Sequence, residues 1–250
     1  MLRVDGLSIA YDGTPVLEGA NLQIEAGSFV SLVGPSGSGK SSLLRAIMGL
    51  QRPLAGRIET ALAPRDIGML FQDDALLPWR SAAENVALGL RLRGEGRGPA
   101  MAEAESWLTR LGLAGFGDRY PRALSGGQRK RVALAQVLAL KPRLLLMDEP
   151  FASLDAITRA RVTQDLLALV ESQRTTVLLV THDLEEALAL SDVVYLLSRG
   201  PRARISQRYT VPIPRPRDVV KARTHPAFAP LLESLWQDLS REVVGETVAA

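Results

Sequence analysis

The chain has 250 residues, enough for one large domain or for a core that carries a subdomain. Hydrophobic residues make up 46% and charged residues 23% of it, a composition that excludes a largely disordered protein. There is no cysteine, which excludes disulfides and thiolate metal sites and fits a reducing compartment. No signal peptide is expected, and no apolar run approaches the roughly 18 residues of a membrane-spanning helix. At a membrane, the protein would therefore be a peripheral subunit.

Short strands and turns are expected in the first third of the chain. Apolar and polar residues alternate over residues 2–4, 7–9 and 21–25, and Gly13 and Gly27 mark turns between these segments. Phe29–Val33 is a short apolar strand that ends abruptly at a glycine-rich loop, and a helix follows over residues 42–50. A further strand is expected over residues 67–71.

The sequence changes character between residues 73 and 122, where Ala, Leu, Glu and Arg replace most β-branched residues. Helices are expected over residues 84–92 and 99–111, with a flexible glycine-rich segment over 94–98 between them. The pattern predicts a helical subdomain, about residues 73–142, inserted into an α/β core.

Strands and helices alternate in the next part of the chain. The apolar segments 144–147 and 176–180 are typical of strands buried on both faces of a parallel sheet, and a strand is also expected over 193–197. Helices are expected over 129–140, 157–171 and 184–190. The predicted fold class is α/β with a mostly parallel sheet, preceded by an N-terminal antiparallel β subdomain.

The last part of the chain, residues 206–250, is expected to be a proline- and arginine-rich tether followed by an amphipathic helix. Apolar residues recur there every three or four positions from Phe228 to Val243. We favour a helix that covers the core over a docking or dimer surface. Eight basic residues between Arg199 and Arg223 are opposed along the sequence by Asp218 alone. For these we favour a solvated surface over contact with anionic lipid or nucleic acid.

The loop after the first buried strand matches the phosphate-binding P-loop pattern. It consists of Gly34, Pro35, Ser36, Gly37, Ser38, Gly39, Lys40 and Ser41. Its glycines allow backbone N–H groups to approach phosphate oxygens closely. Lys40 is expected to reach the β- and γ-phosphates of a nucleoside triphosphate, and the Ser41 hydroxyl is expected to bind Mg²⁺.

Polar side chains stand at the ends of three other predicted strands. Asp148 ends an apolar strand and is predicted to complete the magnesium shell, while Glu149 is predicted to orient the attacking water. His182 follows the next strand, where open α/β sheets bind ligands, and is expected to bond the γ-phosphate or that water. Gln72 ends an earlier strand and is a candidate to bridge water or Mg²⁺.

A second glycine-rich segment opens another predicted helix. It consists of Leu124, Ser125, Gly126, Gly127 and Gln128, with Ser125 placed as the N-cap. Helix starts favour anions because unpaired N–H groups and the helix dipole point the same way. Since the P-loop already serves one nucleotide, this segment is predicted to serve the nucleotide of a second copy, in a two-fold dimer with two composite sites.

With these residues in order, residues 1–205 resemble the ATP-hydrolysing subunit of ABC transporters. The resemblance rests on the P-loop, Gln72, the segment 124–128, the acidic strand end, Ser153-Leu154-Asp155 and His182. It implies that ATP lies between the P-loop of one subunit and the 124–128 segment of its partner. It also implies that Tyr11 stacks on adenine, that Ser42 belongs to the ATP site, that Asp155 lies at the dimer seam, and that Gln72 senses a membrane permease.

Finer features resemble bacterial importers of nitrate, sulfonates or taurine, among them Phe71-Gln72, Leu76-Leu77-Pro78-Trp79 and Pro214–Asp218. The resemblance implies a homodimer at the cytoplasmic face of the membrane, a separate permease and, indirectly, an extracytoplasmic solute-binding protein. The chain departs from the family at Lys130, where Gln is common, and at Gln136, where Arg is usual. No nucleic-acid partner is expected. A non-transport ABC ATPase acting on nucleic acid or ribosomes is the alternative, although such chains usually carry two ATPase halves or a coiled coil.

Overall fold

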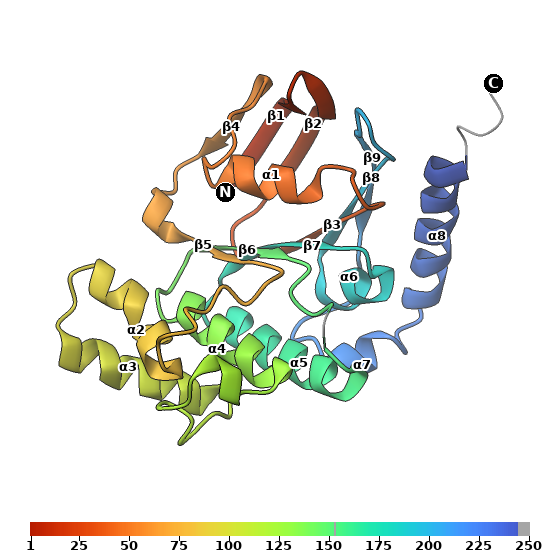
Figure 1. Ribbon diagram of the computed structural model, residues 1–250. Coiled ribbons are helices and arrows are strands. Elements are labelled where there is room, and N and C mark those ends of the chain that lie inside the picture. Colours follow the sequence, from red (N-terminus) through yellow and green to blue (C-terminus); the bar gives the residue numbers. More distant parts are fainter. Residues whose placement is uncertain (153, 245–250) are drawn as a thin grey trace. The chain divides into compact units, whose positions relative to one another are not determined.

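The computed structural model describes residues 1–152 and 154–244, so Ser153 lies outside the described residues (Figure 1). The chain divides into two compact units. Unit 1 comprises Met1–Pro64 and Leu167–Ala250, and unit 2 comprises Arg65–Leu166. Among the described residues, no helix is both long enough and apolar enough to cross a membrane.

Unit 1 begins with a three-stranded antiparallel sheet, which confirms the expected N-terminal β subdomain. Its strands are β1 (Leu2–Tyr11), β2 (Thr14–Ile24) and β4 (Ala55–Thr60), in the order β2-β1-β4. The two short strands expected over residues 2–4 and 7–9 form one strand, because a register shift between Val4 and Leu7 restores the alternation of buried side chains. Gly6 takes the left-handed backbone conformation at this bulge, with φ of 56°.

The parallel strands of unit 1 lie in the order β7-β3-β8, with β3 (Phe29–Val33) between β7 (Thr176–Thr181) and β8 (Val193–Leu197). Every residue of β3 and β7 is buried, as expected for strands covered on both faces. The helices α1 (Lys40–Ile47) and α6 (Leu184–Leu190) follow β3 and β7. An unexpected edge strand, β9 (Ile205–Thr210), pairs antiparallel with β8 and crosses the expected domain end at residue 205.

Unit 2 contains the parallel strands β5 (Ile67–Leu70) and β6 (Leu144–Asp148) and the helices α2 (Ala82–Leu92), α3 (Arg97–Arg110) and α4 (Gly126–Leu138). Two 3-10 turns, Pro64–Asp66 and Pro121–Ala123, and helix α5 (Ala156–Ser172) complete it, although the first turn and α5 both extend across the boundary between the units. The helix expected from residue 99 begins at Arg97 instead, so the glycine-rich segment is shorter than expected. Pro99 is accommodated because the first-turn N–H groups of a helix need no intrahelical partner.

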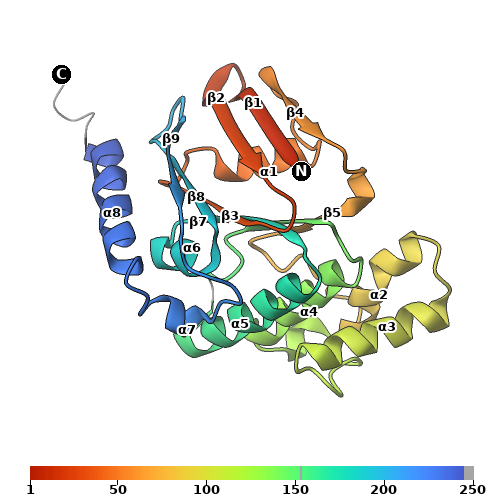
Figure 2. The ribbon, with the colours of Figure 1, turned by 180° about the vertical axis from the view of Figure 1, so that it is seen from behind.

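The tail of the chain packs against the rest of unit 1 through α7 (Val219–Ala222) and α8 (Phe228–Val244), and both views show α8 alongside α6 (Figures 1 and 2). Phe228 and Leu235 are buried, so one face of α8 covers the core as favoured from the sequence. The opposite side remains open, since Trp236 is 55% exposed.

The solvated surface favoured for the basic segment is wrong for Arg217, and other residues of the segment form ion pairs. Arg217 is only 4% exposed, and its Nη2 lies 3.3 Å from a carboxylate oxygen of Asp192. Arg215 contacts the other oxygen of Asp192 at 2.6 Å. Acids distant in sequence also pair with Arg204 (Glu18, at 2.6 Å) and with Arg223 (Glu185, at 3.2 Å). These ion pairs could not be predicted from the sequence, because each pair joins segments far apart in the chain.

Candidate active site

The P-loop of unit 1 forms a tight backbone cradle between β3 and α1. Gly39 has φ of 86° and serves as the N-cap of α1, a conformation that favours glycine. At Gly34, an added Cβ would lie 2.9 Å from both Cβ and the carbonyl oxygen of Leu197, so only glycine fits there. The Lys40 ammonium is folded over the same loop and donates to the carbonyl oxygens of Gly34 and Pro35, both at 2.8 Å.

Ser38 gives the clearest sign that this cradle is built for a ligand. The residue is 1% exposed, and its Oγ has no hydrogen-bond partner among the described residues. A buried hydroxyl without a partner costs about 1–3 kcal/mol. It is therefore expected to bond an atom that the protein does not supply, and a phosphate oxygen has the right chemistry for a hydroxyl in this loop.

Three other predicted residues of unit 1 lie close to the P-loop or leave the same sheet edge. The Tyr11 hydroxyl at the end of β1 lies 3.1 Å from Ser42 Oγ in α1, and the tyrosine is 39% exposed. In the parallel pairing of β3 with β7, Val33 lies opposite Thr181. Gly34 and His182 therefore leave the same edge of the sheet, and His182 is exposed there. Unit 1 thus brings together Tyr11, the P-loop, Ser42 and His182.

Unit 2 places Gln72, Asp148 and Glu149 at or just after one strand edge. Leu70 of β5 lies opposite Met147 of β6, so the segments that carry Gln72 and Asp148 leave the same edge of the pair. Asp148 is 7% exposed and Glu149 is partly buried. Glu149 has φ of 43°, a left-handed conformation that is uncommon for a side chain of this kind and that clusters at functional sites.

The segment Leu124–Gln128 starts helix α4 as predicted, with Ser125 as its N-cap. Ser125 Oγ accepts from the Gln128 N–H at 3.3 Å, and the Gln128 side chain accepts from the Ser125 N–H at 2.9 Å. This capping box fixes the helix start. A Cβ added at Gly127 would lie 2.6 Å from Cγ2 of Thr158, so α4 and α5 approach each other closely here.

Asp155 caps the start of α5. Its Oδ1 accepts from the Thr158 N–H at 3.0 Å. Hydrogen bonds from the Thr158 side chain and backbone hold the pKa of the Asp155 carboxyl below its ordinary value. The side chain therefore has a clear structural task, and its predicted place at a dimer seam stays a prediction.

The residues present fit ATP with Mg²⁺. Within unit 2, the side chains of Asp148 and Gln72 carry oxygen atoms and follow from one strand edge, and oxygen is the donor atom that Mg²⁺ prefers. Among the described residues there is no cluster of three or more His, Cys, Asp or Glu suited to a metal ion.

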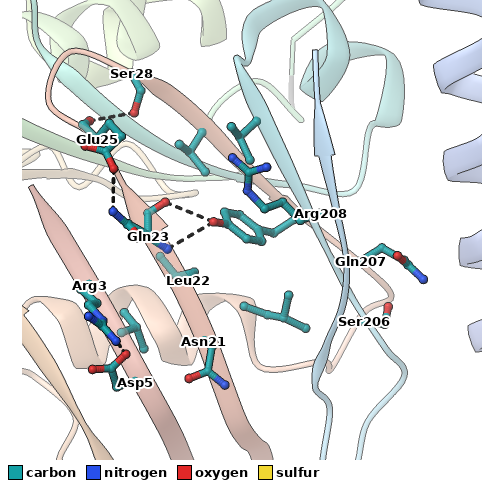
Figure 3. A pocket seen from close by; sticks show the side chains of 15 residues that line it. Arg3, Asp5, Asn21, Leu22, Gln23, Glu25, Ser28, Ser206, Gln207 and Arg208 are labelled. Atoms are coloured by element: carbon teal, nitrogen blue, oxygen red, sulfur yellow. Dashed lines mark hydrogen bonds and ion pairs between the residues drawn. The ribbon is translucent and has the colours of Figure 1, made fainter.

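A groove of about 900 Å³ in unit 1, between β1–β2 and β8–β9, contains none of the predicted residues (Figure 3). Its polar side chains contact one another, as Figure 3 shows for Arg3 with Asp5, at 2.7 Å, and for Gln23 with Glu25, at 2.6 Å. Hydrogen bonding with Arg3 lowers the pKa of the Asp5 carboxyl. The groove is polar but offers no cradle comparable to the P-loop.

Lys130 was singled out from the sequence only as a departure from a pattern. In the structure it is fully buried, and its ammonium contacts the segment that carries Gln72. A lysine near the start of a helix gives no sequence signal of burial, so its role follows only from the structure.

The chain is similar to known proteins both in sequence and in fold. The ABC transporter family profile matches residues 17–152. The chain is 42% identical to the aliphatic sulfonates import ATP-binding protein SsuB 2 of Rhodococcus jostii (strain RHA1), over 96% of this chain and 95% of that protein. It is 44% identical to the taurine import ATP-binding protein TauB of Yersinia pestis bv. Antiqua (strain Antiqua), over 80% of this chain and 81% of that protein.

The fold is similar to that of a solved dimeric ATP-binding cassette in a post-hydrolysis state, bound to ADP and Pi. The TM-score is 0.76 at 32% identity, over 84% of this chain and 99% of that one. The predicted fold class is therefore confirmed. A P-loop cradle on a buried parallel strand, a capped 124–128 helix start and these similarities lead to one conclusion: the chain belongs to the ABC transporter family.

Proposed function

We propose that this chain hydrolyses ATP to power the import of a sulfonate, taurine or a related small compound through a separate membrane permease. The observation that carries the hydrolytic part is the P-loop cradle, with Lys40 folded over it and the Ser38 hydroxyl buried without a partner. The solute class is supported by the 42–47% identity to aliphatic sulfonate and taurine import proteins.

Each predicted residue has a distinct task in this proposal. The loop backbone from Gly34 to Gly39, with Ser42, binds the phosphates, and Tyr11 stacks on adenine. Lys40 exchanges the carbonyl oxygens of its own loop for the β- and γ-phosphate oxygens, which carry more charge. Ser41, Gln72 and Asp148 hold Mg²⁺, and that ion, when bound, neutralises charge on the transferred phosphoryl group.

Hydrolysis itself is assigned to Glu149 and His182. Glu149 orients the attacking water, and His182 donates to the γ-phosphate. Phosphoryl transfer needs mostly positioning and charge stabilisation, so one carboxylate that holds the water is sufficient. The left-handed backbone at Glu149 supports this task, since it fixes the direction in which the carboxylate leaves β6.

The proposed working form is a homodimer in which Leu124–Gln128 of one subunit completes the ATP site of the other. The capped start of α4 supplies N–H groups for the partner's γ-phosphate. Asp155 lies at the seam between the subunits. The dimeric form of the similar ATP-binding cassette supports this arrangement.

The permease is proposed to contact the loop between β5 and α2, which exposes an unusual side chain. Trp79 is 69% exposed, although tryptophan is the residue most enriched in interface hot spots. The loop is held from beneath by the buried Asn85, which bonds Leu77, Arg80 and Ser81. A rigid, exposed aromatic side chain suits docking because little entropy is lost on binding. On this proposal the subunit lies at the cytoplasmic face of the membrane, and a solute-binding protein acts through the permease.

Uptake of labelled solutes by the parent organism tests the proposal. Deleting the gene should abolish uptake of labelled taurine or of an aliphatic sulfonate, and the intact gene should restore it. Glu149→Gln should fail to restore uptake although the purified variant still binds ATP, whereas Glu95→Gln, on the exposed loop between α2 and α3, should behave as the wild type. Unchanged uptake of both solutes in the deletion strain would refute the proposed solute class.

The same strain separates transport from the alternative of an ABC ATPase acting on nucleic acid or ribosomes. Purification of the tagged chain from membranes should recover a multispanning membrane protein. Recovery of ribosomes or nucleic acid in its place would overturn the transport role.

A further inference from the structure

Lys130 is a buried lysine near the start of α4. Its side chain is 1% exposed, which is rare for a residue whose charged end normally remains in water. Burying an ammonium group costs several kcal/mol unless charges and hydrogen bonds compensate for lost hydration. The contacts of the Lys130 ammonium therefore show which part of the protein compensates for its burial.

The ammonium contacts one short segment of chain, the residues that directly follow β5. Nζ donates to the carbonyl oxygen of Gln72 at 3.0 Å and lies 3.5 Å from that of Phe71. It also lies 3.0 Å from Oδ1 of Asp74. Lys130 thus binds the backbone of Gln72 itself, leaving the glutamine side chain exposed for other contacts.

The neighbouring residue of α4 extends this contact to the helix start. Arg129 Nε lies 3.3 Å from Oδ2 of Asp74, so the two carboxylate oxygens of Asp74 contact adjacent residues of the helix. Arg129 also donates from Nη1 to the carbonyl oxygen of Leu124, the residue before the Ser125 cap, at 2.8 Å. A continuous set of polar contacts within unit 2 therefore joins Gln72 to the 124–128 segment.

We propose that Lys130 is a positioning residue that ties the Gln72 segment to the start of α4, so that these two parts of unit 2 move together. The proposal rests on the proposed function, in which Gln72 serves the nucleotide of its own subunit and Ser125 serves that of the partner. Lys130 then couples the two half-sites that one chain supplies. Nucleotide binding at one half-site shifts the other, which makes hydrolysis cooperative in ATP.

Three variants of the full-length protein test this role. Lys130→Met keeps an unbranched apolar stem, in a side chain one atom shorter than that of lysine, but removes the charge and the hydrogen-bond donors. Lys130→Gln keeps an N–H donor for the Gln72 carbonyl. Lys141→Met is the matched control, because the Lys141 side chain is 72% exposed and lies in the same unit.

Lys130→Met should lower kcat about tenfold, at the lower end of the effect of losing an outer-shell partner of a metal ligand. The Hill coefficient for ATP should fall towards 1. The Kd for ATP measured on dilute monomer should stay within about twofold of wild type, because the P-loop and Tyr11 belong to unit 1. The kcat and the Hill coefficient of Lys130→Gln should lie between those of Lys130→Met and those of the wild type. Lys141→Met should match the wild type in all three measurements.

Amide hydrogen exchange supplies a readout that does not depend on hydrolysis. Lys130→Met should speed exchange over both residues 71–74 and residues 124–128, whereas a local packing defect would affect α4 alone. If the wild-type protein does not hydrolyse ATP, the proposed function is refuted. The hydrogen-exchange comparison still tests whether Lys130 ties the two segments together.

Wild-type kcat and Hill coefficient in a folded Lys130→Met protein would overturn the proposal, as would equal losses of kcat and monomer ATP affinity. If Lys130→Met does not fold, Lys130→Gln is judged by the same measurements. If neither folds, Lys130 serves folding alone and the proposal is wrong.

Discussion

Removing the side chain of Asn85 should separate permease coupling from basal ATP hydrolysis. The residue is 0% exposed in α2, and its Oδ1 accepts from the Leu77 N–H at 2.7 Å. Its Nδ2 lies within 3.2 Å of the carbonyl oxygens of Leu77, Arg80 and Ser81. An amide nitrogen has only two protons for these three acceptors, so at most three hydrogen bonds form at once.

The expected cost of Asn85→Ala follows from these contacts. Three buried hydrogen bonds at about 1 kcal/mol each give about 3 kcal/mol, with a range of about 2–4 kcal/mol because some carbonyl groups will gain water. The loss falls on the loop that presents Trp79, which should then lose its fixed orientation. Asn21→Ala is the control: Asn21 is exposed, also bonds two backbone groups, and should cost less than about 1 kcal/mol.

Urea unfolding of the purified variants measures the stability term, and ATPase assays with and without the permease measure coupling. Asn85→Ala should keep basal hydrolysis within about twofold of wild type and lose most of the stimulation by permease, because loop order contributes to binding. A variant that is as stable as wild type would refute the hydrogen-bond argument. Full stimulation in a destabilised variant would refute the assignment of Trp79 to the permease surface.

Three further outcomes follow from contacts within single units. Gly127→Ala should destabilise unit 2 by about 1–2 kcal/mol in urea unfolding, since an added Cβ meets the Thr158 methyl group, and Thr158→Ser should restore the loss; no rescue would contradict the steric cause. Asp192→Ala should lower the free energy of unfolding by about 3 kcal/mol, because it leaves the buried Arg217 cation, whose pKa is already lowered by burial. Arg217→Met should lower it by less, because Arg215 still pairs with the Asp192 carboxylate. Equal costs in urea unfolding would argue against this asymmetry. The Asp218 carboxyl caps α7, and the backbone N–H of Lys221 lowers its pKa from 3.8. The stability that the ionised Asp218 carboxylate gives to α7 should be complete above pH 3.8 and should disappear as the pH falls through the lowered pKa. Amide exchange of Val220 and Lys221 should therefore accelerate in acid, after correction for intrinsic rates, and Asp218→Asn should remove this dependence.

Strands and helices were predictable where the sequence alternates apolar and polar residues, repeats apolar residues every three or four positions, or contains a short apolar run. Segments such as Phe29–Val33 and residues 144–147 are largely apolar because both faces are buried. The missed strands β4 and β9 are polar edge strands, in which Arg57 and Arg208 extend into solvent. Such strands are held by pairing with neighbours rather than by burial, and pairing leaves little trace in a local pattern.

For the candidate site, too, some features were predictable from the sequence and others were not. Motifs such as Gly34–Ser41 are predictable because backbone geometry demands particular residues at fixed spacing. The contacts of Lys130 with Gln72 and of Arg217 with Asp192 join residues tens of positions apart. Charged residues in a helix or a basic tail are usually solvated, so only the fold reveals that these two are buried.

The central claim is that the 124–128 segment completes the ATP site of a partner subunit. Mixing two inactive variants tests it most directly. Lys40→Ala damages the P-loop and Ser125→Arg damages the 124–128 segment, so a mixed dimer retains one site with both halves intact. The mixture should therefore hydrolyse ATP well above the sum of the two variants measured separately. Hydrolysis equal to that sum, in a mixture shown to contain mixed dimers, would contradict the composite site.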